Sequence, residues 1–483
     1  MTETRKHHTH RHTPSPPPPT KNHHPIFPSH TTIPNLPVKI KLLCDIIAST
    51  PPPDIDKTLN DSGIIVTTEN VEDVLKLCYS YPSTAVKFFR WAGYQLHDKH
   101  SPYSWNLLID ILGKNGKFDT MWGAINSMMT EGLLSLNTFA SVFGSYVIAG
   151  DVDGAIKAFE DMGKYGLVRD IVALNMLFSA ICRDGQAKDA KKFLDIVRRD
   201  IRPDGDTYAI LLEGLENEGD GVNARVTFGE MVRDVGWDPG NFAAYDSFLH
   251  ALLKGSGGLS EAMECFEDLR VRKCCPGVRF FKSALNECAI KGDVECAEVL
   301  WDAITVGKGC NVDTELYNSM ILVYCCVREF VLARRLLDEM VFNGVFPDLQ
   351  SYNILFKYLL KSRKLDEAIL IFGEMVKNEF VPTHANCCLA VKSLLDGGDP
   401  YTAIKVWKCM VENYDYGIEE IGNILVNGLR DLNRVPEAVK YAEDMIERRI
   451  KVSSNTLSRL RQSLVKAGKV PVYDELLRKW KLH

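Results

Sequence analysis

The chain of 483 residues is 46% hydrophobic and carries a formal net charge of −6 at pH 7. That hydrophobic content supports a packed core over most of the length and excludes a chain that is disordered throughout. The mildly acidic balance is neutral about nucleic acid as a partner, because binding depends on where Lys and Arg gather rather than on their total.

The N-terminal segment, residues 1–60, differs in composition from the rest of the chain. It holds a run of four prolines and seven of the twelve histidines, and Glu3 is the one acid in its first 44 residues. Such a segment cannot build a core and is expected to be disordered. Its basic character is compatible with an organelle transit peptide, with residues 38–47 as the best amphipathic candidate. The histidines at 7–10 can ligate metal, but a solvated tail is the simpler interpretation.

Residues 65–101 are expected to form a helical cap or a degenerate repeat. Thr68 and Glu69 can begin a helix that runs through Ser80, and Pro82 can begin a second one. The second helix carries three aromatic residues, Phe88, Phe89 and Trp91. Their rings are suited to base stacking, but the favoured interpretation is that they form a core that covers the open end of the array.

Residues 102–453 repeat with a period of about 35, giving about ten units. Alanines recur at this spacing, and an apolar residue, often Met, follows seven residues later. Seven residues are two helical turns, so both side chains share one helix face, where Ala admits a neighbouring helix and Met fills irregular space. The clearest members are Ala333, Ala368, Ala403 and Ala438, followed by Met340, Met375, Met410 and Met445.

One unit, residues 349–383, shows the internal plan. Apolar residues at helical spacing precede and follow a polar turn at residues 361–364, and Pro382 ends the unit. Each repeat is therefore a helical hairpin. Stacked hairpins predict an all-α superhelical solenoid, with residues 454–483 as a partial repeat and a capping helix from Tyr473 to Trp480.

The ends of the units carry a family resemblance. Pro-Asp or a related pair is followed by Tyr-Asn or its equivalent in residues 202–209, 312–318 and 346–353, and the period is 35. Tetratricopeptide repeats share the hairpin plan but have 34 residues and a different signature. Residues 102–453 closely resemble the P-type subclass of the pentatricopeptide repeat family.

The resemblance implies a single-stranded RNA partner that is read at one base per repeat. In the family, the fifth residue of each first helix and the last residue of the unit face the RNA. Carried over, the reading residues are Asn106, Asn175, Asp204, Asn318, Asp348, Asn353, Thr383, Asn423 and Ser453. Asn with Asp resembles a uridine reader and Asn with Ser a cytidine reader, which includes Asn106 with Ser135, and Asn353 with Thr383 should prefer a pyrimidine.

The chemistry of these residues permits two interpretations. An Asn amide offers a donor and an acceptor to the edge of an unstacked base. Alternatively, Asp204, Asp348 and Ser453 precede helices and are suited to N-capping alone. Other units lack the pattern at the same place, and Lys282 there is interpreted as a contact to the RNA backbone. The fifth-position residues that depart from Asn are Ala140, Ala209, Asp246, Lys282 and Cys388, and the last position of the ninth unit is Ile418.

Basic residues recur near the end of the first helix. They are suited to tracking phosphates, although a cation near a helix C-terminus also stabilises the helix dipole. The row consists of Lys114, Arg183, Lys254, Lys361 and Lys466.

The sequence gives no sign of catalysis. It contains no zinc-deaminase pattern, P-loop or nucleophile elbow. We expect no enzyme, cofactor or metal site, and no apolar run approaches the roughly 18 residues that span a membrane. The fourteen cysteines include no CxxC pair and are expected to be reduced.

The expected function is sequence-selective RNA binding in a plant-type organelle, either the mitochondrion or, as the alternative, the plastid. Stabilisation, processing, splicing or translation of transcripts are its expected roles, with protein partners in processing or in the ribosome. The other hypothesis is a structural or protein-interaction solenoid, for example a component associated with an organellar ribosome.

Overall fold

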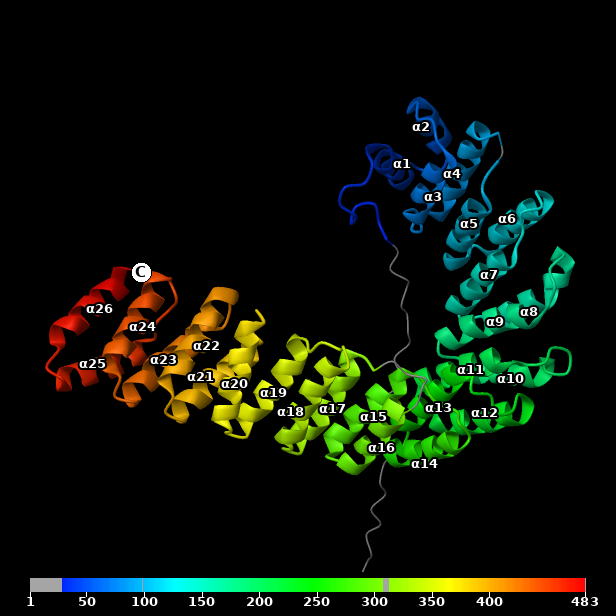
Figure 1. The fold of residues 1–483 in the computed structure, drawn as a ribbon. Helices are drawn as coiled ribbons and strands as arrows, with labels where there is room; N and C mark the ends of the chain where they lie inside the picture. The colour runs from blue at the N-terminus through cyan, green and yellow to red at the C-terminus, as the bar shows by residue number, and fades with distance from the viewer. Residues whose placement is uncertain (1–27, 98, 307–311, 483) are drawn as a thin grey trace, which may run out of the picture. The chain divides into compact units, whose positions relative to one another are not determined.

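The computed structural model describes residues 28–97, 99–306 and 312–482. In these ranges the chain forms α-helices and one short 3₁₀ helix, and no strand. It divides into two compact units, residues 1–189 and 190–483 (Figure 1). The all-α fold predicted from the sequence is therefore confirmed.

Unit 1 consists of a four-helix N-terminal part followed by the first hairpins of the array. Its helices are α1 (Val38–Ser49), α2 (Ile55–Asp61), α3 (Thr68–Lys76), α4 (Pro82–Gln95), α5 (Pro102–Lys114), α6 (Phe118–Thr130), α7 (Leu136–Ile148), α8 (Val152–Asp161), the 3₁₀ helix η1 (Met162–Tyr165) and α9 (Ile171–Arg183). The helix α10 (Ala187–Val197) begins at the end of this unit and continues into the next.

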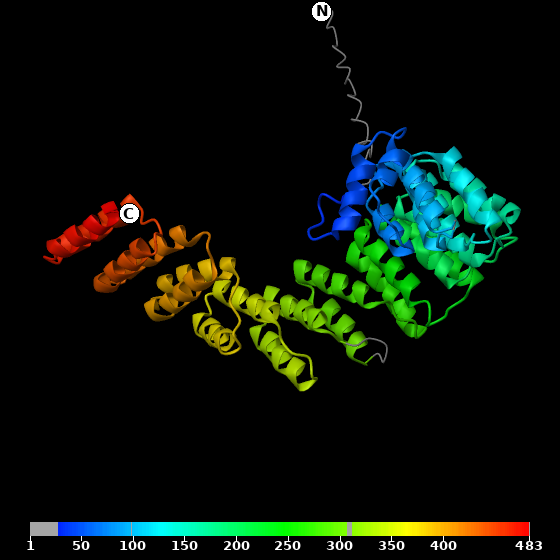
Figure 2. The same cartoon turned by 90° about the horizontal axis from the view of Figure 1, so that it is seen from above.

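Unit 2 continues the array of hairpins, which follow one another in chain order (Figure 2). Its helices are α11 (Gly205–Glu218), α12 (Gly221–Asp234), α13 (Phe242–Lys254), α14 (Gly258–Val271), α15 (Val278–Lys291), α16 (Val294–Val306), α17 (Thr314–Cys326), α18 (Phe330–Phe342), α19 (Leu349–Lys361), α20 (Leu365–Lys377), α21 (His384–Asp396), α22 (Pro400–Asn413), α23 (Ile418–Asp431), α24 (Val435–Glu447), α25 (Ser454–Lys466) and α26 (Val470–Leu482).

The repeated alanines and methionines form the core of the array. In unit 2 the first helix of a hairpin packs against its own second helix and against the first helix of the next hairpin, as α17 packs against α18 and α19. The repeated alanines and methionines lie on the second helices, at these contacts. Solvent does not reach Ala333, Met340, Ala368, Met375, Ala403, Met410, Ala438 and Met445. Close packing of small and flexible side chains explains why the sequence repeats them.

The N-terminal part corrects one expectation. Residues 1–60 were expected to be disordered, but within and next to this segment α1 and α2 are helices that pack against α3 and α4. Ile40, Leu43 and Ile47 lie on one face of α1 and are buried, so the amphipathic pattern serves packing here. Thr84 Oγ1 donates to the Ile47 carbonyl at 3.0 Å and joins α1 to α4.

The boundaries of the cap also differ from the prediction. The N-cap of α3 is Thr67, whose hydroxyl accepts from the Asn70 N–H, and α3 ends at Lys76 rather than at Ser80. Pro82 begins α4 as predicted. The three aromatic residues of α4 are buried, which agrees with their expected role in the core.

The C-terminal segment is a hairpin of α25 and α26, where a partial repeat and a capping helix from Tyr473 to Trp480 were expected, and α26 contains the expected helix. Trp480 Nε1 donates to the Val452 carbonyl at 3.0 Å and fastens α26 to the preceding repeat.

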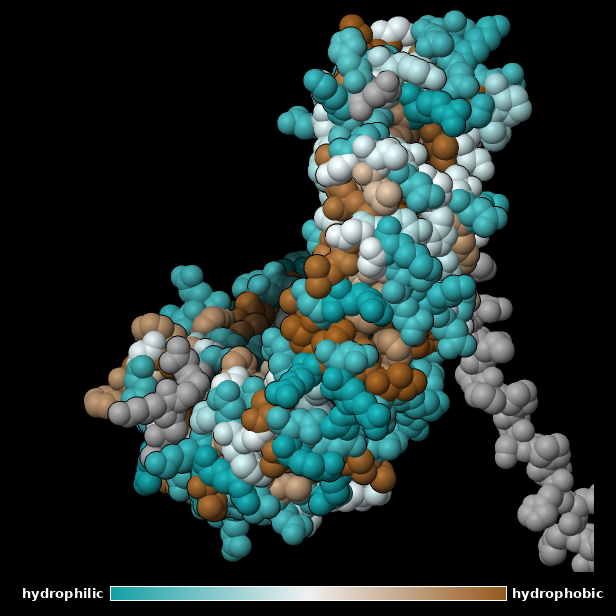
Figure 3. All heavy atoms as spheres, turned by 90° about the vertical axis from the view of Figure 1, so that its right-hand side faces the viewer, coloured by the Kyte–Doolittle hydropathy of each residue, from teal (hydrophilic) through white to brown (hydrophobic). Residues whose placement is uncertain are grey.

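Disulfide bonds, metal sites and membrane-spanning helices were not expected from the sequence, and the structure bears on them only for the residues that it describes. The thirteen cysteines in these ranges are free thiols. No cluster of three metal-ligating side chains occurs there, and the histidines at 7–10 lie outside the described residues. Within the same ranges, no helix has the length and apolarity that a membrane crossing requires. On the face drawn in Figure 3, hydrophobic side chains form separate patches between hydrophilic ones.

Candidate nucleic-acid interface

The candidate reading residues lie at the starts of the first helices. The residue expected at the end of each unit is the N-cap of the next first helix, as for Asp170, Asp204, Asp313, Asp348 and Ser453. Their side-chain oxygens accept from the backbone N–H three residues later, at 2.8 to 3.1 Å. The capping interpretation therefore describes a real contact, and it fixes the side chain at the mouth of each helix.

The prediction for the ninth unit is wrong. Ile418 is the first residue of α23, and the N-cap is Gly417. Asn423 is consequently the sixth residue of its helix rather than the fifth. The shift arises because α23 begins 34 residues after the start of α21, whereas α19 and α21 begin 35 residues apart.

Asn318 and Asp348 contact each other across two consecutive repeats. Asn318 Nδ2 donates to Asp348 Oδ1 at 3.1 Å, and Asn318 Oδ1 accepts from Ser351 Oγ at 2.5 Å. Burial alone raises the pKa of Asp348, but hydrogen bonds from Ser351 and Asn318 bring it below its ordinary value. Since an amide has two N–H groups and two acceptor positions, Asn318 keeps one of each.

Asn353 is more fully engaged. Its Nδ2 donates to the Leu349 carbonyl at 2.8 Å, and its Oδ1 accepts from the Thr383 N–H at 2.9 Å and from Asn386 Nδ2 at 2.8 Å. It therefore keeps a donor but no acceptor. Thr383 is exposed and its hydroxyl makes no capping bond.

Asn423 differs from Asn353 because both of its N–H groups are occupied, while its oxygen is only partly occupied. Its Nδ2 donates to the carbonyls of Glu419 at 2.7 Å and Lys451 at 3.1 Å, while Oδ1 accepts from the Ser453 N–H at 2.8 Å. It keeps one acceptor position. The three asparagines of unit 2 thus differ in the hydrogen bonds that they still offer.

The remaining pairs are less defined. Asn106 Oδ1 accepts from Thr138 Oγ1 at 2.7 Å, and the Ser135 N–H donates to the same hydroxyl at 3.4 Å. Asn175 is half-buried on α9 in unit 1, and Asp204 is the N-cap of α11 in unit 2.

We call the place where the first helices of two consecutive repeats meet a junction. At two junctions the fifth position carries a charged residue in place of Asn. Asp246 Oδ1 accepts from the Phe280 N–H at 2.9 Å, and its Oδ2 accepts from Arg279 Nε at 2.8 Å. Asp246 thereby caps α15 from the preceding repeat, because the N-cap of α15 is Gly277, which has no side chain. Lys282, expected to touch the RNA backbone, pairs with Asp313 at 2.9 Å and with Glu315.

Sequence reasoning missed a buried acid near these junctions. Glu216 on α11 is 2% exposed and accepts from His250 Nδ1 at 2.7 Å and Lys254 Nζ at 3.0 Å. Arg279 Nη2 lies 2.8 Å from the other carboxylate oxygen. Burial raises the pKa of Glu216, but these hydrogen bonds and charges lower it to about 2. The signal in the sequence was the place of Glu216 four residues after Leu212 and eight after Tyr208, on the apolar face of its helix.

The basic row occupies its predicted place, since each member is the last residue of its helix. Lys114 pairs with Asp110 at 2.6 Å, and Lys254 is engaged by Glu216. Arg183, Lys361 and Lys466 are exposed and form no ion pair with a described residue. Lys291, which the sequence interpretation overlooked, holds the same position at the end of α15.

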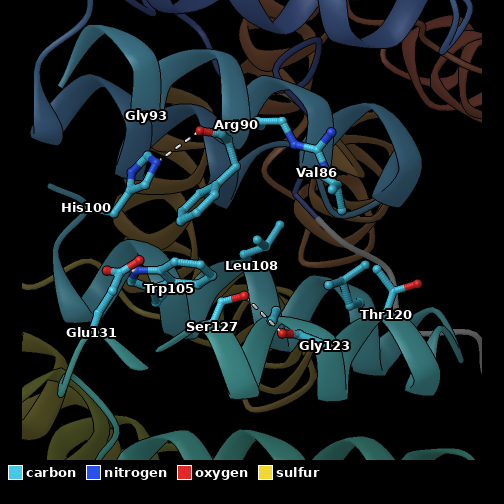
Figure 4. A pocket seen from close by; sticks show the side chains of 13 residues that line it. Val86, Arg90, Gly93, His100, Trp105, Leu108, Thr120, Gly123, Ser127 and Glu131 are labelled. Atoms are coloured by element: carbon cyan, nitrogen blue, oxygen red, sulfur yellow. Dashed lines mark hydrogen bonds between the residues drawn. The ribbon is translucent and has the colours of Figure 1, made fainter. Parts of the chain in front are cut away.

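A cleft of about 420 Å³ lies in unit 1 between α4, α5 and α6 (Figure 4). Leu108 and Trp105 contribute to its wall, and Trp105 Nε1 donates to Glu131 Oε2 at 3.1 Å. His100 stacks on Phe89 with ring centroids 3.6 Å apart. None of the predicted reading residues lines this cleft.

Comparisons with known proteins place four matches along the array. Models described as the PPR repeat match residues 103–133, 138–167 and 350–380, and one described as the PPR repeat family matches residues 312–360.

The chain is also similar to curated plant proteins. An Arabidopsis thaliana pentatricopeptide repeat-containing protein, named as mitochondrial, is 36% identical over 36% of the chain and 34% of its own length. A second, also named as mitochondrial, is 31% identical over 36% of the chain and 32% of itself. A third with the same description is 26% identical over 83% of the chain and 70% of itself. The matched part thus spans about a third of the first two relatives.

Two solved structures are similar at low identity. The pentatricopeptide repeat protein PPR10 in complex with an 18-nt psaJ RNA element is 18% identical, with a TM-score of 0.41 over 91% of the chain and 68% of PPR10. Yeast Rmd9p in complex with 16nt target RNA is 12% identical, with a TM-score of 0.29 over 92% and 96%.

Proposed function

Because the chain belongs to the pentatricopeptide repeat family, we propose that it binds single-stranded RNA and acts in organellar RNA metabolism. Family membership supports RNA as the partner, and the names of several relatives support a mitochondrial location. The observation that carries the proposal is the contact of Asn318 with Asp348, which holds an amide at a repeat junction with one donor and one acceptor unused.

An unstacked uracil matches that remaining capacity. Its ring N–H and a neighbouring carbonyl require one acceptor and one donor, which the Asn318 amide offers side by side. Asn353 and Asn423 offer a donor or an acceptor respectively, together with the hydroxyl groups of Thr383 and Ser453. We expect bases to be read at these three junctions of unit 2, and more weakly at Asn106 in unit 1.

The charged junctions are not expected to read bases. The two oxygens of Asp246 are occupied by Arg279 and a backbone N–H, and Lys282 is held by two carboxylates. One base per repeat therefore applies only to part of the array. A bound segment would be shielded from nucleases and kept single-stranded, which suits stabilisation or processing of a transcript.

Sequencing of RNA that is crosslinked to the protein in mitochondria tests this proposal. We expect enrichment of a few transcripts whose bound segments place pyrimidines opposite the junctions of Asn318, Asn353 and Asn423. Recovery of no RNA would overturn RNA binding.

A protein-binding role is the second candidate. It is favoured by Phe342 and Phe346, which are 91% and 74% exposed near the end of α18. Large exposed aromatic side chains are common at protein interfaces. Uniform recovery of ribosomal RNA in the same experiment, together with ribosomal proteins that persist after nuclease treatment, would support this second role.

A further inference from the structure

The junction between α21 and α23 lacks both residues of a reading pair. Cys388 occupies the fifth position of α21, and Gly417 is the N-cap of α23. Gly417 has φ of +66°, a left-handed conformation that favours glycine. The loop before it, residues 414–417, carries two tyrosines.

An aromatic stack fills this junction. The rings of His384 and Tyr416 lie 4.6 Å apart at an interplanar angle of 25°. His384 Nε2 is 2.9 Å from the Tyr416 carbonyl, so the loop is bonded to the first residue of α21. Tyr414 meets the His384 ring edge-on at 5.3 Å, and its hydroxyl donates to the Pro382 carbonyl at 2.8 Å.

The stack lies beside the position at which other repeats carry Asn. Cys388 Sγ is 3.7 Å from His384 Nδ1, one helical turn further along α21. Thr383, which pairs with Asn353, directly precedes His384 in the chain. Tyr416 is 63% exposed although His384 stacks on its ring and Tyr414 meets the ring at 5.9 Å and 77°, so part of the ring remains accessible.

We propose that Tyr416, supported by His384, is a stacking platform for one unpaired base between the junctions of Asn353 and Asn423. This inference rests on the proposed RNA binding and adds a contact that does not depend on base identity. Every base presents a π-face, so stacking on an aromatic ring tolerates any sequence. The Tyr416 carbonyl is already bonded to His384, and Cys388 is a weak donor, so little is left here to read a base edge.

The charges around the platform favour a base over a phosphate. The exposed residues Asp415, Glu419 and Glu420 lie in or next to the loop, and Lys392 follows Cys388 by one turn. Three carboxylates against one ammonium repel a phosphate at close range. The affinity that Tyr416 supplies should therefore change little with salt.

The test uses the full chain and an RNA of uridines and cytidines, with one nucleotide for each junction of unit 2. A single 2-aminopurine replaces each nucleotide in turn, because its fluorescence is quenched by stacking. We expect strong quenching at the nucleotide between those assigned to Asn353 and Asn423. Exchanging the base at that position should alter Kd by less than about twofold, in contrast with its neighbours.

Three variants of Tyr416 separate stacking from folding. Tyr416→Ala and Tyr416→Leu should abolish this quenching and weaken binding between about 5-fold and 100-fold, while Tyr416→Phe keeps both properties. Tyr401→Ala is the matched control, because Tyr401 is 62% exposed in the same unit but lies on the second helix α22.

The outcomes distinguish the two proposals. Binding of the Leu and Ala variants at wild-type affinity would overturn the platform while leaving RNA binding intact. If the wild-type chain binds none of the RNAs, the proposed function itself fails.

Discussion

At the scale of single residues, the junctions of the array are defined by how many hydrogen bonds each fifth-position side chain retains. Asn318 keeps a donor and an acceptor although it is 5% exposed, because its two bonds go to Asp348 and Ser351. At Asn353, by contrast, most of the amide's hydrogen-bonding positions are occupied by backbone groups and by Asn386. Identical residues in register therefore do not offer the same free hydrogen-bonding groups.

Replacement of Asn318 tests this reading directly. Asn318→Ala should raise Kd about tenfold for an RNA with the preferred base opposite this junction, since one good pair of hydrogen bonds is lost. RNAs with another base at that position should be affected less. The measurement is a titration of RNAs that differ at one nucleotide. Asn343→Ala, on the C-cap of α18, is the control that should bind normally.

Glu216 gives a prediction about stability and pH. Its pKa is lowered from 4.5 to about 2, so the folded state is stabilised above pH 4.5, and this stabilisation is lost as the pH falls toward 2. Glu216→Gln should reduce the free energy of unfolding by about 3 kcal/mol near neutral pH, because His250, Lys254 and Arg279 lose their shared carboxylate.

Urea unfolding of both proteins across this pH range measures the effect. The difference between wild type and variant should shrink as acid protonates Glu216 in the wild type. A difference that stays constant down to the lowest pH would contradict the assignment. Glu213→Gln is the control, since Glu213 is exposed on the same helix and should change stability by less than about 0.5 kcal/mol.

At the scale of helices, most first helices are capped by their own N-cap residue, but a first helix can also take its cap from the preceding repeat. The clearest case is α15, where Gly277 supplies no cap and Asp246 of α13 accepts from the Phe280 N–H in its place. A β-carbon on residue 277 would lie 2.9 Å from Asp246 Oδ1, so a side chain there would displace the substitute cap.

The capping role of Asp246 can be separated from its charge. Asp246→Ala should lower the free energy of unfolding by about 2 kcal/mol, because α15 loses its cap and Arg279 loses a partner. Asp246→Asn keeps an oxygen for the Phe280 N–H and should lose about half as much. Chemical denaturation measures both values, and equal losses would argue against capping.

At the scale of the whole molecule, the basic row is discontinuous. Lys114 and Lys254 are held by acids, whereas Lys361 forms no ion pair with a described residue. Phosphate tracking should consequently depend on a few cations rather than on the complete row.

The salt dependence of RNA binding measures this difference. For single strands, each phosphate contact contributes about −0.7 to the slope of log K against log salt concentration. Lys361→Ala should make the slope less steep by about that amount. Lys254→Ala should leave it unchanged, because Lys254 is engaged by Glu216. Equal effects of the two substitutions would refute the distinction.

The sequence by itself determined the scaffold, the register and the starts of most first helices. A period of 35 residues brings the same residue types to each helix contact, so buried Ala and Met reveal the packing without coordinates. Capping is also local, since Asp348 and Ser453 bond to groups three residues away. These features depend on spacing along the chain, which the sequence shows directly.

Only the tertiary structure decided which partners the polar residues choose. Asn318, Asp246 and Glu216 bond to groups about 30 or more residues away, and small differences in side-chain position decide which bonds form. The position of α1 depends on its contacts with α3 and α4, and the His384–Tyr416 stack depends on the short loop that joins α22 to α23. Such contacts join separate elements, so periodicity along the chain does not encode them.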